Sequence, residues 1–381
     1  EDYKRFFNVV NKHLVFYSED SGFYKYYKGI IEYLLRYTNL TIHYVTSDPD
    51  DQIFELSKSQ PAIRAYYIGE KRLITLMMKL ETDIMVMTMP DLENFHIKRS
   101  YVRKDIEYIY IPHGMDSLNL TMRTHSMDHY DTVFCVGKHQ KEEIEKTEAL
   151  YQTPRKTLVE WGYGLLDEMC MEYQQSTCEV HEKKQILIAP SWQPDNIVDS
   201  CLTEILDQLK GKGYQVTVRP HPQHIRHKKE KMESLKQRYA QNPDIEIQTD
   251  FSSNSTVFEA DLMITDWSGI AYEYAYTTKK PVLFINTPMK IMNPEYEKID
   301  TVPLNIWMRD EIGCALNLDQ MELVAETVGS LLAEKDCYAD KITRFVENYV
   351  YHSGSSARVG ARYIIEQLQK KVKERRGETE A

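Results

Sequence analysis

Residues 261–287, DLMITDWSGIAYEYAYTTKKPVLFINT, decide the fold of this chain. An apolar strand runs into the polar turn at 265–269, an amphipathic helix follows, and a second apolar strand completes a βαβ unit. Ligands of open α/β sheets bind at the carboxyl ends of strands, and a helix starting at Ser268 would offer unpaired N–H groups to an anion. The turn is therefore a candidate phosphate or pyrophosphate site, although the same residues also make an ordinary N-cap.

Two further apolar strands end in a histidine. One, VTVRPHP at 216–222, places His221 between two prolines, and the other, IYIPHG at 109–114, ends in His113 and Gly114. The prolines stiffen the backbone around His221, and a glycine after His113 lets a substrate approach the main chain closely. A single histidine at a strand end is more often a structural residue, so these patterns alone leave both a catalytic and a structural role open.

Length, charge and cysteine content restrict the function classes. The 381 residues suit two α/β domains of about 150 to 180 residues each. A formal net charge of -11 argues against a nucleic-acid groove as the main surface. Six cysteines without a Cys-x-x-Cys pair indicate reduced thiols in a cytosolic compartment. No run reaches the roughly 20 apolar residues of a membrane-spanning helix, and the start at Glu1 rather than Met raises the expectation of a preceding segment.

Apolar runs and helical stretches alternate along the chain, as is typical of parallel sheets. The runs expected to form strands, besides those of the opening unit, are 13–17, 40–45, 64–68, 83–88, 107–111, 132–136, 156–161, 185–189, 214–219 and 245–248, and the clearest helices are 23–36, 199–210 and 228–239. Residues 171–184 are polar and lack periodicity, which predicts a linker. We therefore expect two doubly wound, Rossmann-like α/β domains at 1–172 and 185–350. A helix within 351–381 should pack back on the first domain, as in the GT-B architecture.

Four motifs in this order resemble the CDP-glycerol glycerophosphotransferases of teichoic acid synthesis and related capsule polymerases. They are His113-Gly114, ILIAPSW at 186–192, RPHP at 219–222 and TDWS at 265–268, and the resemblance covers roughly residues 105–290. The chain departs from the family pattern at 162–167, where an arginine is missing, and at Gly269, where the family carries a serine.

The resemblance implies roles for the strand-end residues. His113 would be the general base, because an imidazole near pKa 6.5 can take the proton of an attacking hydroxyl. His221 would bind the donor phosphate or stabilise its charge, with Arg219 as a weaker electrostatic candidate. Asp266 completes the predicted catalytic set, and it would orient a histidine or bind a hydroxyl, since a carboxylate repels phosphates.

A second group of residues would bind the donor. Ser268 and Gly269 at the helix start, with Thr265 beside them, would hold the pyrophosphate. Glu273 could accept from ribose hydroxyls, although a solvated helix face explains it nearly as well. The remaining members of the predicted donor-binding set are Gly114, Ser191 and Arg219. Trp192, next to Ser191, is expected to pack in the fold rather than to stack on a base.

No cofactor and no metal is expected. His221, His224 and His227 are spaced by three, but Pro222 should break the helix that would bring them together. The chain has no Gly-x-x-x-x-Gly-Lys-Ser/Thr loop and no strand-linked Gly-x-Gly-x-x-Gly motif, which disfavours a P-loop kinase and a dinucleotide dehydrogenase.

The sequence thus predicts an enzyme that moves glycerol phosphate, or a related polyol phosphate, from a CDP-activated donor to a hydroxyl of a lipid-linked glycan or polymer. The cleft would lie between the domains. A glycosyltransferase with a nucleotide-sugar donor and a non-catalytic nucleotide- or glycan-binding module are the alternatives. We expect a cytoplasmic protein bound peripherally to the inner face of the membrane, through the basic segments 98–104 and 370–376.

Overall fold

The computed structural model describes residues 1–377 and divides into two compact units. The first unit holds Glu1–Glu168, Met292–Thr301 and the chain from Tyr349 onward, and the second holds Met169–Ile291 and Val302–Asn348. The first unit is therefore assembled from three separate segments of the sequence. The domain boundaries proposed from the sequence stay predictions, and the last four residues of the predicted 351–381 segment lie outside the described residues.

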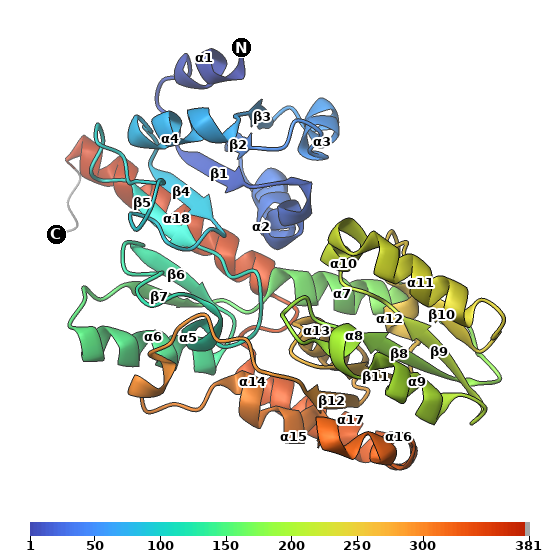
Figure 1. Ribbon diagram of the computed structural model, residues 1–381. Helices are drawn as coiled ribbons and strands as arrows, with labels where there is room; N and C mark the ends of the chain where they lie inside the picture. Colours follow the sequence, from blue (N-terminus) through green and yellow to red (C-terminus); the bar gives the residue numbers. More distant parts are fainter. Residues whose placement is uncertain (378–381) are drawn as a thin grey trace. The chain divides into compact units, whose positions relative to one another are not determined.

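The first unit is built on a seven-stranded parallel sheet in the order β3-β2-β1-β4-β5-β6-β7 (Figure 1). Its strands are β1 (Leu14–Ser18), β2 (Ile42–Thr46), β3 (Ile63–Tyr67), β4 (Ile84–Met87), β5 (Glu107–Tyr110), β6 (Thr132–Cys135) and β7 (Thr157–Glu160). Every residue of β1, β2, β4 and β6 is buried, because helices cover both faces of a parallel sheet. All seven strands predicted for this part of the chain are present.

Helices complete the first unit, and the C-terminal helix packs back on it as expected. They are α1 (Asp2–Phe7), α2 (Tyr24–Tyr37), α3 (Ile53–Ser59), α4 (Glu70–Met78), α5 (Leu118–Thr121), α6 (Lys138–Tyr151), the start of α7 (Gly164–Gln175) and α18 (Ser356–Arg376). α18 lies against α2 (Figure 1). A Cβ at Gly360 of α18 would come within 2.8 Å of Ile30 and 2.9 Å of Trp161, and the Trp161 indole N–H donates to the Ser356 carbonyl at 3.0 Å. This close contact needs a glycine.

The second unit carries a six-stranded parallel sheet in the order β10-β9-β8-β11-β12-β13. Its strands are β8 (Lys184–Ala189), β9 (Tyr214–Val218), β10 (Ile245–Ile247), β11 (Leu262–Thr265), β12 (Val282–Asn286) and β13 (Gly313–Asn317). Its helices, besides the end of α7, are α8 (Ile197–Ser200), α9 (Leu202–Leu209), α10 (Pro222–His227), α11 (Lys229–Tyr239), α12 (Ser255–Glu259), α13 (Ile270–Thr278), α14 (Leu304–Trp307), α15 (Arg309–Ile312), α16 (Val324–Ala333) and α17 (Lys335–Tyr349). The predicted Rossmann-like class is correct for both units.

In each sheet the strand order reverses once, between β1 and β4 in the first unit and between β8 and β11 in the second. Such a reversal opens a crevice at the carboxyl ends of the two strands, because their following connections leave to opposite sides. The residues singled out by the sequence follow β5, β8, β9 and β11, which are the reversal strands or their direct neighbours.

Several local predictions were wrong. Helix α7 continues to Gln175, so only 176–183 of the predicted linker is irregular and exposed. The predicted helix at 199–210 is two helices that meet at Cys201. The helix after β11 begins at Ile270 rather than at Ser268, with Gly269 as its N-cap. Within residues 1–377, no helix is long and apolar enough to span a membrane.

Candidate active site

The turn after β11 is organised around Asp266, whose side chain is fully buried. Its carboxylate accepts hydrogen bonds from the Ser191 backbone N–H at 2.8 Å, the Ser191 hydroxyl at 2.9 Å and the Thr287 hydroxyl at 3.0 Å. Ser191 follows β8 and Thr287 follows β12, so one carboxylate ties together the ends of three adjacent strands. A buried carboxylate needs such donors. The geometry shows a positioning role, and the catalytic assignment of Asp266 stays a prediction.

Arg309, which the sequence reasoning missed, supports the same turn from α15. The guanidinium donates to the Asp266 carbonyl and to the Asn286 side-chain oxygen, each at 2.8 Å. It also lies 3.9 Å from the Trp267 ring centroid and 4.4 Å from that of Phe284, and these cation–π contacts help to offset its burial. Burial lowers its pKa to about 10, so it stays charged at neutral pH. No motif marks this residue, because it lies in a short helix 43 positions after Asp266.

The predicted pyrophosphate residues differ in what they can reach. The Thr265 hydroxyl is buried and donates to the Ala189 carbonyl at 2.6 Å, so it joins β11 to β8 inside the sheet. Ser268 is half-buried, and Gly269 is exposed with open space where a Cβ would stand. Both precede α13, whose amino end carries a partial positive charge, while the N–H groups of Ala271 and Tyr272 donate to the Ser268 and Gly269 carbonyls. Ser268 and Gly269 can therefore meet an anion, whereas Thr265 holds the strand.

His221 caps a helix with its own side chain. Its Nδ1 accepts the Gln223 backbone N–H at 3.2 Å, and Pro222 occupies the first position of α10. Proline at this position starts a helix, because its missing N–H would have no partner there. Burial lowers the pKa of His221, which favours the neutral ring. Since Nδ1 is an acceptor, the neutral ring carries its proton on Nε2 and can donate a hydrogen bond to an anion.

The reason given for excluding a metal at the three spaced histidines was wrong. Pro222 begins α10 instead of breaking it, and the rings of His221, His224 and His227 surround Trp192 at centroid distances of 6.4, 4.9 and 5.9 Å. His224 is buried, and this lowers its pKa to about 4. The part of the chain that the structure describes contains no cluster of three His, Cys, Asp or Glu side chains suited to a metal ion. Trp192 packs among imidazoles, in line with the packing interpretation.

Arg219 and Glu273 belong to one electrostatic pair at the end of β9. The Arg219 guanidinium contacts the Thr256 hydroxyl at 3.3 Å and lies 4.9 Å from the Phe251 ring centroid. Burial lowers the pKa of Arg219, and the carboxylate of Glu273 on α13 counteracts that shift. Glu273 is half-buried, so it is more than a solvated helix face. Arg219, Glu273, Ser268 and His221 all belong to the second unit, and the interaction between Arg219 and Glu273 links β9 to α13.

His113 lies at the carboxyl edge of the first sheet. Its Nδ1 is 3.4 Å from the Tyr110 hydroxyl, and its ring stands edge-on to Tyr26 of α2 at a centroid distance of 6.2 Å. Burial lowers the pKa of His113, while a hydrogen bond with the Thr88 backbone at the end of β4 partly counteracts this. The ring is therefore neutral at pH 7 and can accept a proton. Tyr26 was not anticipated from the sequence.

Gly114 lies close to the side chain of Asp116. A Cβ at this position would come within 2.8 Å of the Asp116 carboxylate, which would then have to turn away. Its predicted role in donor binding stays untested.

The region 162–167, where the family arginine is missing, has a structural role. Asp167 accepts the backbone N–H groups of Gly354 at 2.7 Å and Ser356 at 3.0 Å, and these bonds hold the start of α18.

Solved structures show the same fold. The wall teichoic acid polymerase TagF matches with a TM-score of 0.62 at 17% identity, covering 96% of this chain and 91% of that chain. A UDP-GlcNAc 2-epimerase from Methanocaldococcus jannaschii, in complex with UDP-GlcNAc and UDP, matches with a TM-score of 0.60 at 14% identity, covering 93% of this chain and 99% of that chain. These likenesses confirm the expected GT-B architecture. Among curated proteins, no sequence matches this chain significantly.

The sequence itself identifies the family. Residues 3–366 match the family described as CDP-glycerol:poly(glycerophosphate) glycerophosphotransferase, which extends the resemblance far beyond the motifs between 105 and 290. The match therefore includes both sheets and most of α18. The chain belongs to this family of CDP-glycerol glycerophosphotransferase enzymes.

Proposed function

We propose that the protein transfers glycerol phosphate, or a related polyol phosphate, from a CDP-activated donor to a hydroxyl of a lipid-linked glycan or polymer. The observation that carries the proposal is His113, a strand-end imidazole kept neutral by burial in a chain of this enzyme family. A TagF structure soaked with CDPG supports the same class of donor. The product would belong to teichoic acid or a related cell-surface polysaccharide.

The proposed step is a displacement at phosphorus. The acceptor oxygen bonds to the phosphorus that carries the glycerol, the bond from that phosphorus to the bridging oxygen breaks, and CMP leaves with the electron pair. His113 takes the proton of the acceptor hydroxyl as the new bond forms. The charge on the phosphates would be stabilised by the Nε2–H of His221, the guanidinium of Arg219 and the amino end of α13.

The other predicted site residues take supporting roles in this proposal. Ser268 and Gly269 contact the pyrophosphate, and Glu273 accepts from the ribose hydroxyls. Asp266, Ser191 and Thr265 fix the ends of β8 and β11, so that the donor meets a preorganised turn.

Nucleotide release tests the proposal and separates it from the alternatives. The purified protein is incubated with CDP-glycerol, CDP-ribitol or a panel of UDP-sugars, with and without a lipid-linked glycan acceptor. We expect CMP release from a CDP-polyol that depends on the acceptor. UDP release from a UDP-sugar would favour the glycosyltransferase alternative. Nucleotide binding by calorimetry without turnover of any donor would favour the non-catalytic module.

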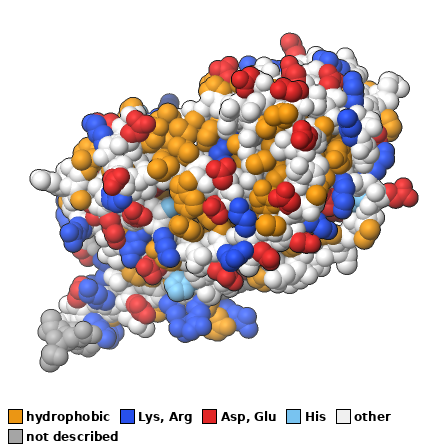
Figure 2. Space-filling view, turned by 90° about the horizontal axis from the view of Figure 1, so that it is seen from below, with side chains coloured by type: hydrophobic (Ala, Val, Ile, Leu, Met, Phe, Trp, Pro, Cys, Tyr) orange, Lys and Arg blue, Asp and Glu red, His pale blue; other side chains and the backbone are white. Residues whose placement is uncertain are grey.

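We further propose peripheral contact with an anionic membrane through the end of α18. All four basic side chains of 98–104 have partners in the protein. In 370–376, Arg375 pairs with Asp83 and Lys371 donates to the Asp105 carbonyl. Basic and acidic side chains are interspersed on the face seen in Figure 2, with a small basic group at the lower left. The end of α18 also borders a groove of about 770 Å³, lined in part by Leu368, Val372, Lys373 and Arg376.

Vesicle co-sedimentation tests this membrane contact. Each basic side chain near an anionic surface contributes only about 1 kcal/mol, so several must act together and salt must release them. We expect pelleting with phosphatidylserine-containing vesicles at low salt and little with neutral ones. Replacing Lys370, Lys373 and Arg376 with Gln should abolish it. Equal pelleting with both vesicle types, or binding that resists high salt, would contradict the proposal.

A further inference from the structure

The loop that follows His113 is fastened to the first turn of α6. Gln140 is fully buried, and its side-chain Nε2 donates to the backbone carbonyls of Gly114 at 3.3 Å and Asp116 at 3.1 Å. Its Oε1 accepts the Val136 backbone N–H at 2.9 Å, at the end of β6. One amide therefore joins the His113 loop to the neighbouring strand, and both of its polar atoms are used.

Two other residues of α6 hold the same loop. His139 Nε2 lies 2.7 Å from the Met115 carbonyl, and burial lowers the pKa of His139 to about 4, so the ring is neutral and donates from Nε2. Glu143, also buried, accepts the Ser117 hydroxyl at 2.5 Å and the Asn119 backbone N–H at 3.0 Å. Together the contacts of His139, Gln140 and Glu143 span the loop, so the helix fixes the backbone from 114 to 119.

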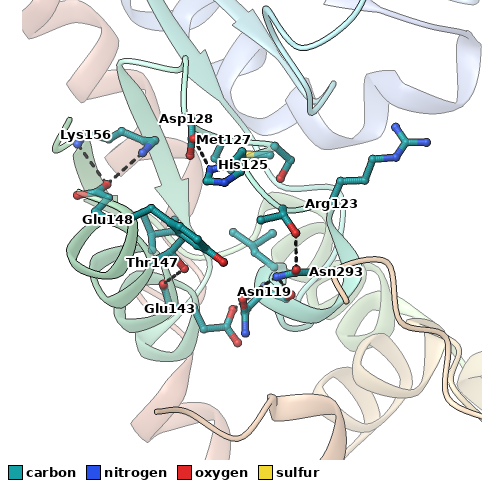
Figure 3. A pocket seen from close by; sticks show the side chains of 15 residues that line it. Asn119, Arg123, His125, Met127, Asp128, Glu143, Thr147, Glu148, Lys156 and Asn293 are labelled. Carbon is teal, nitrogen blue, oxygen red and sulfur yellow. Dashed lines mark hydrogen bonds and ion pairs between the residues drawn. The ribbon is translucent and has the colours of Figure 1, made fainter. Parts of the chain in front are cut away.

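Apolar packing adds to these polar contacts. Met115 and Leu118 of the loop are buried, and Leu118 belongs to the same core cluster as Ile144 of α6. Further along, α6 borders a small cavity of about 50 Å³, and Figure 3 shows Glu143, Thr147 and Glu148 on one side of it and Asn119 and Asn293 on another. The side chains of His139, Gln140 and Glu143 thus supply the polar contacts that hold the His113 loop on α6.

We propose that Gln140 is a positioning residue for His113, which it keeps at the acceptor hydroxyl by holding the carbonyls of Gly114 and Asp116. This inference rests on the proposed role of His113 as general base. Only an amide meets the local requirement, because the site needs two N–H donors toward carbonyl oxygens and one acceptor toward Val136. Without the donors, two partly buried carbonyls lose this partner and the loop is free to shift.

Gln140→Met is the main test, since methionine is close in size and lacks the amide. A displacement of the base of about 1 Å can lower turnover by as much as 10²-fold, so we expect kcat to fall by roughly 10- to 100-fold. The affinity for CMP, measured by calorimetry, should not change, because the residues proposed to bind the donor phosphates belong to the second unit. Thr147→Val is the matched control on the same helix, because the Thr147 hydroxyl bonds only the Glu143 carbonyl within α6. It should leave kcat unchanged.

A second readout separates positioning from general damage to the fold. Water that enters a loosened loop should move the pKa of His113 upward toward 6.5, as followed by NMR titration of the labelled ring. In a His113→Ala background, Gln140→Met should lower the residual turnover no further. If Gln140→Met does not fold by circular dichroism, Gln140→Asn replaces it, because Asn keeps a neutral amide but is one methylene too short to hold all three contacts.

The outcomes distinguish this inference from the proposed function. An unshifted His113 pKa together with a kcat within about 2-fold of the parent would overturn the role of Gln140. The same loss of turnover with and without His113 would also overturn it, because the effect would then not pass through His113. If His113→Ala itself turns over like the parent, the general-base assignment fails, and the NMR titration still decides whether Gln140 positions the ring.

Discussion

His113 and His221 both follow a buried parallel strand, and burial lowers the pKa of each, yet their rings are prepared for opposite tasks. The Nδ1 of His221 is occupied by the backbone N–H of Gln223, so only its Nε2–H faces outward and the ring is a hydrogen-bond donor. The His113 ring instead bonds the Thr88 backbone, and its Nδ1 makes only a long contact of 3.4 Å with the Tyr110 hydroxyl. His113 can therefore take up and release a proton, whereas His221 is suited to stabilise the negative charge of a phosphate.

This difference comes from the backbone that follows each histidine. After His221, Pro222 starts α10 at once, and the imidazole becomes its N-cap. After His113 comes a loop, which α6 holds from outside through Gln140. The position at the end of a strand therefore does not by itself determine what a histidine does. The next residue decides which ring nitrogen remains available for chemistry.

The largest effect should come from His113→Ala. Loss of a general base typically costs 10²- to 10⁴-fold, so we expect kcat to fall by roughly that factor with little change in donor affinity. His113→Gln serves as the control for lost packing against Tyr26. Turnover of the alanine variant within a few-fold of the parent would show that another group takes the proton. The proposed difference in role between His113 and His221 would then be wrong.

Ser268→Asp tests whether the phosphates of the donor bind at the start of α13, in the same unit as His221. A carboxylate at the start of α13 interacts favourably with the helix but repels the phosphates of the donor. At a separation near 4 Å this repulsion is on the order of 1 to 4 kcal/mol, so CMP or CDP affinity should fall at least about fivefold. Ser268→Asn, which is neutral and similar in size, should bind nearly as well as the parent. Calorimetry showing unchanged affinity for the aspartate variant would move the donor phosphates away from this turn.

A smaller effect is expected at His221, where two substitutions separate its two roles. His221→Asn can still cap α10 through its side-chain oxygen, whereas His221→Ala cannot. Both should weaken CMP binding by about tenfold, because a hydrogen bond to a charged group is lost. Only the alanine variant should lose stability, by about 1 kcal/mol in chemical unfolding. Normal CMP binding by both variants would reduce His221 to a helix cap.

The sequence was sufficient for the fold and for the strand-end residues, because both depend on local patterns. Apolar runs, prolines and glycines predict the strands and their ends, which is why His113, His221 and the turn at 265–269 could be found. Arg309 and Gln140 could not, because their contacts join segments distant in sequence and their own neighbourhoods carry no motif. The role of Pro222 was misjudged since proline both ends and begins helices, and only the following turns distinguish the two.

The last effect concerns the acid stability of the second unit, where His224 lies beside His221. Burial lowers the pKa of His224 to about 4, and both ring nitrogens lack a hydrogen-bond partner among the described residues. Since the folded pKa lies below the unfolded value near 6.5, the unfolded chain takes up the proton first as the pH falls. The stability tied to His224 is therefore complete above pH 6.5 and declines toward pH 4, by at most about 1.4 kcal/mol per pH unit.

His224→Leu, of similar volume, should flatten this decline in unfolding curves between pH 6.5 and 4.5 and leave stability at pH 8 nearly unchanged. His227→Leu is the control, because His227 is exposed and should not alter the slope. An identical pH slope in the parent and His224→Leu would mean that the His224 ring finds a partner or water when it is charged, and that the second unit tolerates a protonated histidine next to its proposed phosphate site.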